Sequence, residues 1–155
     1  MKKLIFPLIA FIAITSCNQV NKGTPRLQND QTAKIDTLCF VRLSGLQSQD
    51  TTSLKMIIDG EIVSGQFATF PFQKDSRIGM ISGVKTGEII KGVWHYQQEG
   101  VDDSLAFEFM LQSDRLLQKQ TSFDENTGRE YLNDTASFRL EFQKQDCKRA
   151  KFTIR

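Results

Sequence analysis

The sequence is short of the residues on which most metal-dependent and acid–base enzymes rely. It has a single histidine, His95, which lies far along the chain from each of the three cysteines, so a zinc site is not expected. No serine stands in a nucleophile elbow, and no glycine-rich loop precedes a helix. Asp102 and Asp103 fall in a predicted turn, where aspartate is common. We therefore expect no enzymatic activity, no metal and no cofactor.

An excess of charge and a long hydrophobic run are also missing. The formal net charge of +2 falls to zero without Lys2 and Lys3, so the chain has no overall field to attract nucleic acid, and no nucleic-acid partner is expected. The longest apolar run, residues 4–14, is too short to cross a hydrocarbon core of about 30 Å. A positive start followed by a short apolar run is typical of a secretory signal peptide.

The apolar run ends in Ile14-Thr15-Ser16-Cys17, an aliphatic residue and two small ones before a cysteine. This pattern resembles the lipobox of bacterial lipoproteins. The resemblance implies that residues 1–16 are a cleaved signal peptide and that the thiol of Cys17 carries a lipid. Two or more acyl chains make membrane attachment stable. The alternative is an ordinary signal peptide with an incidental cysteine.

The segment after Cys17 has little apolar content, so residues 17–35 are predicted to be the lipidated cysteine and a flexible tether. Residue 18, directly after the cysteine, is Asn18. An aspartate at this position would resemble an inner-membrane retention signal. We therefore expect an exported protein that the lipid on Cys17 anchors to the bacterial envelope, at the outer membrane and facing the periplasm.

Cys39 and Cys147 lie near the two ends of the foldable region, residues 36–147. An exported protein meets an oxidising compartment, in which paired thiols usually form a disulfide. We predict a Cys39–Cys147 bridge. Two buried free thiols are the alternative.

The foldable region shows short apolar alternations separated by turn signals. In residues 104–112, for example, Leu105, Phe107, Phe109 and Leu111 share one face, and Asp59-Gly60 is a hairpin turn signal. Strands are predicted over 38–46, 53–59, 61–70, 78–84, 89–97, 104–112, 115–120 and 138–143, and an irregular section over 121–137. These elements predict an all-β, eight-stranded antiparallel up-and-down barrel, lipocalin-like or lysozyme-inhibitor-like, with a β-sandwich as the alternative. Residues 36–147 would form this single domain and residues 148–155 a basic tail.

A barrel of eight strands either fills its interior with side chains or holds one small ligand. The chain has twelve phenylalanines, which favours a filled interior. If the interior is hollow, the expected lining is Phe67, Trp94, Tyr96, Phe107 and Phe109. A recognition loop is predicted at one barrel mouth, formed by Lys74, Asp75, Ser76 and Arg77.

These features favour a membrane-anchored, non-enzymatic envelope lipoprotein that binds an envelope protein. Small lipidated barrels that inhibit lysozyme are similar in size, anchoring and disulfide use, although their short loop motif is missing here. The alternative is a lipocalin-like carrier of a small apolar ligand.

Overall fold

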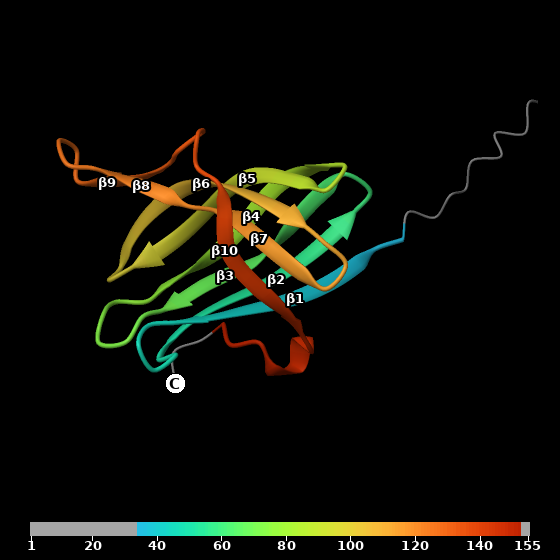
Figure 1. The fold of residues 1–155 in the computed structure, drawn as a ribbon, viewed down its shortest axis with the longest axis horizontal. Helices are drawn as coiled ribbons and strands as arrows, with labels where there is room; N and C mark the ends of the chain where they lie inside the picture. The colour runs from blue at the N-terminus through green and yellow to red at the C-terminus, as the bar shows by residue number, and fades with distance from the viewer. Residues whose placement is uncertain (1–33, 153–155) are drawn as a thin grey trace, which may run out of the picture. The chain divides into compact units, whose positions relative to one another are not determined.

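The computed structural model describes residues 34–152, and these form an all-β protein (Figure 1). Eight strands close an antiparallel barrel in the order β1-β10-β7-β6-β5-β4-β3-β2. The strands are β1 (Asp36–Ser44), β2 (Asp50–Asp59), β3 (Ile62–Phe70), β4 (Arg77–Thr86), β5 (Ile89–Gln98), β6 (Val101–Leu111), β7 (Arg115–Lys119), β8 (Thr121–Asp124), β9 (Arg129–Leu132) and β10 (Phe138–Gln145). The predicted up-and-down barrel is confirmed, and the sandwich is excluded.

The hairpins follow from local backbone preferences. β2 and β3 are joined by Gly60-Glu61, and β4 and β5 by Gly87-Glu88. Each glycine has a φ of 60°, and glycine at the first position of a two-residue loop is the type II′ pattern, whose twist matches that of the flanking strands.

The chain turns within the predicted residues 98–103, but the turn is shorter than predicted. The loop between β5 and β6 consists of Glu99 and Gly100, whose φ angles are 51° and 79°. Two left-handed residues suffice to reverse the chain. Asp102 and Asp103 therefore lie in β6, on the ladder with β5.

The prediction of an irregular section over residues 121–137 is wrong for the two four-residue strands that it contains. β8 and β9 form a separate two-stranded sheet, which extends away from the barrel in Figure 1. Their connection is a turn in which the Asp124 carboxylate accepts hydrogen bonds from the backbone N–H groups of Asn126 and Thr127. Four-residue strands carry too little alternation to be recognised in a sequence.

The seam between the first and last strands is short. β1 and β10 pair over Cys39–Val41 and Gln143–Gln145. Beside this pairing, Cys39 forms a disulfide with Cys147, with a Cα–Cα distance of 5.1 Å, which confirms the predicted bridge. Cys147 begins a 3₁₀ turn, η1 (Cys147–Arg149). The Asp146 carboxylate caps this turn by accepting a hydrogen bond from the backbone N–H of Lys148. The disulfide therefore ties β1 to the segment just after β10, at a seam that has few backbone hydrogen bonds.

The interior of the barrel is filled over most of its depth. The inward side chains of alternate positions form one apolar cluster, and its largest fully buried members are Phe40, Phe109, Phe142, Leu54 and Met56. Each such side chain contributes about 1.5–3 kcal/mol when it is fully buried. No helix within residues 34–152 has the length and apolar character needed to cross a bilayer.

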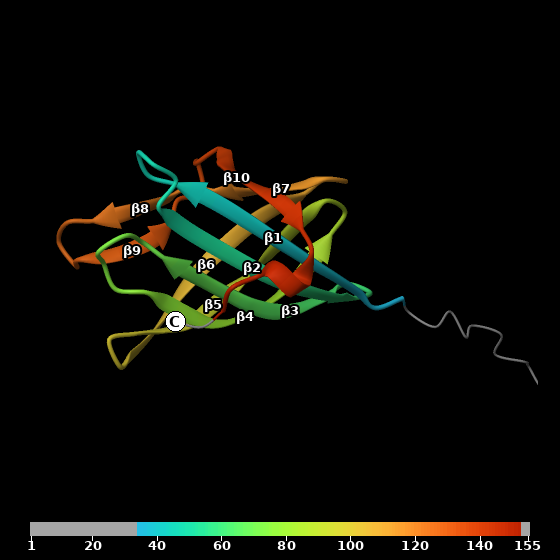
Figure 2. The same cartoon turned by 90° about the horizontal axis from the view of Figure 1, so that it is seen from below.

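The two ends of the barrel differ. One end of the barrel holds the start of β1 and the tight turns after β2, β4 and β6. We call this the entry end. The opposite end, the open end, carries loops 45–49, 71–76 and 99–100 and the connection from β7 to β10, which includes the β8–β9 hairpin. Figure 2 shows these four connections together at the left, away from the start of β1.

Candidate functional site

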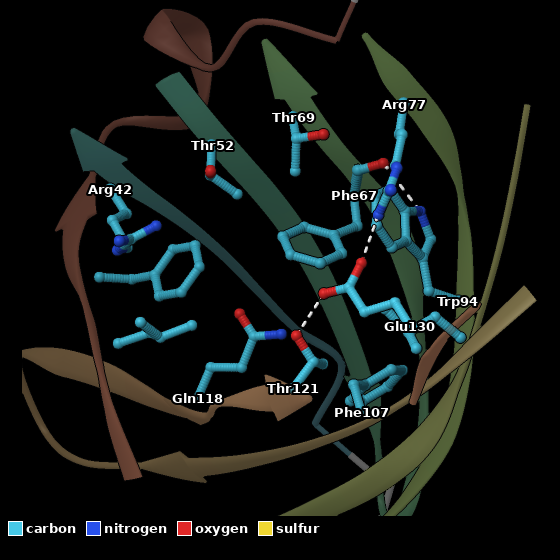
Figure 3. A pocket seen from close by; sticks show the side chains of 13 residues that line it. Arg42, Thr52, Phe67, Thr69, Arg77, Trp94, Phe107, Gln118, Thr121 and Glu130 are labelled. Atoms are coloured by element: carbon cyan, nitrogen blue, oxygen red, sulfur yellow. Dashed lines mark hydrogen bonds and ion pairs between the residues drawn. The ribbon is translucent and has the colours of Figure 1, made fainter. Parts of the chain in front are cut away.

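The open end contains a cavity of about 170 Å³ between the inward faces of the strands and the β8–β9 hairpin (Figure 3). Its lining combines aromatic, aliphatic, hydroxyl, amide and charged side chains. These are Arg42, Thr52, Phe67, Thr69, Arg77, Trp94, Leu105, Phe107, Gln118, Thr121, Glu130, Leu140 and Phe142.

Four of the lining residues form a continuous row across neighbouring strands. Arg42 lies opposite Thr52, Thr52 opposite Thr69, and Thr69 opposite Arg77. Directly opposed residues have Cβ atoms about 4.5–5.5 Å apart. We call Arg42, Thr52, Thr69 and Arg77 the polar row; it crosses β1, β2, β3 and β4 just inside the mouth of the barrel.

The floor of the cavity is aromatic. The rings of Phe67 and Trp94 pack with their centroids 4.6 Å apart, and the ring of Phe142 lies 6.2 Å from that of Phe67. The indole Nε1–H of Trp94 donates to the backbone carbonyl of Phe67 at 3.1 Å, so the polar atom of this buried side chain is satisfied. Phe107 completes the floor, and a methyl group on Gly92 would meet its ring at 2.7 Å. Glycine at position 92 is therefore what lets this ring lie against strand β5.

At one side of the cavity, Arg77 is held by several partners. Its Nη1 lies 2.6 Å from the Glu130 carboxylate, its Nε donates to Gln98 at 2.8 Å, and its guanidinium stacks 5.2 Å from the centre of the Tyr96 ring. Glu130 also accepts a hydrogen bond from the hydroxyl of Thr121. The charge of Arg77 is therefore neutralised within the site.

Arg42, at the other end of the polar row, is different. Its side chain is half-buried, and no carboxylate of residues 34–152 forms an ion pair or hydrogen bond with it. Thr52 and Gln118 are each only 8% exposed, yet neither side chain has a hydrogen-bond partner among the described residues. Their polar atoms open onto the cavity instead, as Figure 3 shows for Gln118.

The cavity exists because the barrel wall opens between β6 and β7. These strands pair only over Phe109–Leu111 and Leu116–Gln118, and nearer the mouth they diverge. The gap is bridged by side chains: the Lys119 ammonium lies 2.9 Å from the Glu108 carboxylate, both largely buried, and Arg129 of β9 pairs with Asp103 of β6. The β8–β9 hairpin thereby stays attached to β6 and supplies Glu130 to the site.

Tyr96 lies beside the cavity, near the Arg77 side chain. Burial raises the pKa of its phenol above the ordinary value; the nearby positive charge of Arg77 opposes this shift, and the carboxylate of Asp103 adds to it. The phenol O–H donates to Asp103 at 3.5 Å. Tyr96 therefore stays protonated and serves to position Arg77 and Asp103.

The residues predicted from the sequence have the following places. Phe67, Trp94 and Phe107 line the cavity, Phe109 is fully buried below it, and Tyr96 faces shallow depressions beside it. In the predicted recognition loop, Lys74 and Asp75 are exposed, Ser76 is half-buried and Arg77 enters the cavity. Cys17 lies outside the described residues.

Sequence reasoning missed Arg42, Thr52, Thr69, Gln118 and Glu130. Four of them could have been found by following the inward frame to the strand ends. In each strand, the next inward-facing position toward the open end lies two residues from a buried apolar residue. Starting from Phe40, Leu54, Phe67 and Leu116, these positions are Arg42, Thr52, Thr69 and Gln118. Glu130 lies in the hairpin that the sequence did not reveal.

Within residues 34–152 there is no group of three or more His, Cys, Asp and Glu side chains placed to hold a metal ion. Compared with known proteins, the chain matches no family model, no curated protein and no solved structure.

Proposed function

We propose that the protein is a lipid-anchored, non-enzymatic binding module of the bacterial envelope and that its open end recognises an envelope protein. The lipobox-like Cys17 would attach the chain to the outer membrane, facing the periplasm. Because the chain enters the barrel at the entry end, the tether leaves the loops of the open end free to contact other proteins. A lipid-anchored protein that presents its loops to the periplasm is placed to meet other envelope proteins.

The observation that carries this proposal is the apolar surface around the mouth of the open end. Six of the ten exposed large apolar side chains of the described residues lie at this end, in its loops or in the strands beside them: Leu43, Leu46, Phe72, Val101, Phe123 and Tyr131. Exposed apolar residues around a hollowed surface are typical of protein interaction sites. The rigid barrel holds these strand ends and loops in place.

The backbone conformation of the open-end loops also supports this proposal. Ser48, Gln73 and Glu99, one in each hairpin loop of the open end, have φ between 51° and 56°. A non-glycine residue in this left-handed conformation costs about 1–2 kcal/mol. At the entry end, the corresponding conformation is taken by glycines. Side chains are thus kept at the open end where glycine would be easier, which is common at functional sites.

Site-specific photo-crosslinking in the bacterial envelope tests the proposal. A photoreactive amino acid replaces Phe72 at the open end, or Ile62 at the entry end as a matched control, since these side chains are 57% and 62% exposed. We expect a discrete protein adduct from position 72 and none from position 62. Equal adducts from both positions, or none from either, would contradict recognition at the open end.

The anchor is tested separately. Metabolic labelling with a radioactive fatty acid should mark the wild-type chain, and a Cys17→Ser variant should lose both the label and its place in the membrane fraction. A variant that keeps the label would contradict lipidation at Cys17.

The second candidate function, a carrier of a small apolar ligand, has one observation in its favour, the aromatic floor of the cavity. The charged and hydroxyl side chains above that floor disfavour a ligand that is wholly apolar. Burying them under such a ligand would remove their water without replacing its hydrogen bonds.

A further inference from the structure

We propose that the cavity at the open end binds a monocarboxylate whose carboxylate pairs with Arg42 and whose remaining part is one apolar group about the size of an aromatic ring. The proposal deepens the proposed function, on which it rests for the site's role in recognition. Its chemistry is argued from the lining side chains alone.

The charge of the lining calls for one negative group. Arg77 and Glu130 form an ion pair at 2.6 Å and cancel, whereas Arg42 has no carboxylate partner among the described residues. The cavity is therefore left with one positive charge. A guanidinium pairs with a carboxylate through two parallel hydrogen bonds, which makes it selective for planar anions.

The neighbouring polar groups suit the same ligand. Thr52 lies directly opposite Arg42, and Thr69 directly opposite Thr52, so their hydroxyls follow Arg42 along the polar row. Thr52 and Gln118 are each 8% exposed and have no hydrogen-bond partner among residues 34–152, and their polar atoms open onto the cavity, where a ligand can bond them. A carboxylate beside Arg42 can accept from the Thr52 hydroxyl, and the Gln118 amide remains a further donor inside the same cavity.

The size of the cavity and its aromatic floor limit the size and polarity of the part of the ligand that carries the carboxylate. A cavity of about 150 Å³ lined by apolar side chains holds one benzene molecule. The cavity here has about 170 Å³, and its floor consists of Phe67, Trp94, Phe107 and Phe142. One aromatic or branched aliphatic group fits, whereas the chain of a membrane fatty acid is too long.

Two sources can supply this chemistry. One is a free aryl or alkyl carboxylate in the periplasm. The other is the free C-terminus of an envelope protein that ends in an aromatic or aliphatic residue, with the exposed loops contacting the rest of that protein. The recognised group, a carboxylate on one apolar side chain, is the same.

The chain carries its own probe, because its one tryptophan, Trp94, lines the cavity. The full-length chain in detergent is titrated with phenylacetate and with phenylacetamide, which has the same ring without the charge, while Trp94 fluorescence is followed. We expect phenylacetate to bind roughly 10- to 100-fold more tightly than the amide, the range for a charge-assisted hydrogen-bonded contact. Equal affinities, or no saturable change with phenylacetate at millimolar concentration, would overturn the proposal.

Variants assign the effect to Arg42. Arg42→Gln should reduce phenylacetate affinity to that of the amide and leave amide binding unchanged, and Arg42→Lys should fall between the two. Arg139→Gln is the matched control, because Arg139 is exposed on the outward face of β10 and its loss changes the net charge equally. If Arg42→Gln binds phenylacetate as wild type does, or if Arg139→Gln weakens it equally, the proposal is wrong.

The two sources are separated with a Gly-Gly-Phe peptide, with a free or an amidated C-terminus. Tighter binding of the free-acid peptide than of phenylacetate identifies a protein C-terminus, and the reverse order identifies a small carboxylate; both support the site. Failure of this proposal is distinguishable from failure of the proposed function. If no carboxylate binds but crosslinks still form from position 72, only the cavity ligand is refuted. If phenylacetate binds but no crosslink forms from position 72, only the protein partner is refuted.

Discussion

The Cys39–Cys147 disulfide should contribute a large part of the stability of the barrel. It joins residues separated by 108 positions in the chain. In the chain-entropy description, a closed loop of that length removes about 16 cal/mol/K from the unfolded ensemble, or about 4.8 kcal/mol at room temperature. Domains of this size are stable by about 5–15 kcal/mol, so loss of the bond should remove a third or more of the total.

Cys147→Ala is the cleaner variant for this measurement. Cys147 is half-buried, whereas Cys39 is 1% exposed and its truncation would also leave a cavity. Guanidinium unfolding followed by Trp94 fluorescence should give a free energy of unfolding about 4–5 kcal/mol below wild type. Wild-type protein kept in a thiol reductant should give the same value, because it lacks the bond but no atoms of the fold.

Hydrogen exchange adds a local expectation. β1 and β10 pair over only three residues each, so without the disulfide this seam should open before the rest of the barrel. Amide protection should fall over residues 39–41 and 143–145 more than in β3. A loss of stability below about 1 kcal/mol would refute the entropic reasoning, and a uniform loss of protection would refute the view that the bond secures one seam.

Three further changes test other parts of the structure. Gly79→Ala would place a methyl group against a backbone carbonyl oxygen of the facing strand β5; we expect a loss of about 1–3 kcal/mol in urea unfolding, and an unchanged midpoint would contradict the close packing of these strands. Lys119→Met leaves the largely buried Glu108 carboxylate with the more distant and exposed Lys91 at 3.5 Å in place of Lys119 at 2.9 Å; thermal unfolding should show a loss of about 1–3 kcal/mol, and a neutral effect would mean that Lys91 and solvent compensate Glu108. Burial raises the pKa of Tyr96 above its ordinary 10.0, so the folded state keeps this proton longer than the unfolded one; the resulting stability is complete below pH 10.0 and is lost as the pH rises through the folded pKa. Tyrosinate absorbance in a Tyr131→Phe variant should titrate above 10.0, and a midpoint at or below 10.0 would contradict this.

Much of the fold could be predicted because its determinants are local. The alternation of Leu105, Phe107 and Phe109 is visible in the sequence and directs these side chains into the barrel. Gly60 and Gly87 fix two hairpins through their own φ angles, whatever the rest of the chain does. The short hairpin strands β8 and β9 were missed because they are held by long-range contacts such as that between Arg129 and Asp103.

The candidate site could be predicted only in part. Phe67, Trp94 and Phe107 follow from the inward frame, and Arg77 from the polar loop that precedes it. Nothing in the sequence says which aromatic residues fill the interior and which border a space. Phe109 lies on the same inward face as Phe107 but is fully buried below the cavity, since the distance of each residue from the mouth depends on how the strands are staggered.

By itself, the sequence determined the antiparallel hairpins, the inward faces of the strands and the pairing of Cys39 with Cys147. Each of these rests on a residue's own conformational preference, on its neighbours at a spacing of two, or on the redox chemistry of thiols. Only the tertiary structure decided that Arg77 is neutralised by Glu130, whereas Arg42 has no carboxylate partner among residues 34–152. That difference arises because the β8–β9 hairpin, which is not part of the barrel sheet, brings Glu130 to Arg77, 53 positions earlier in the chain. No local pattern encodes such a long-range contact.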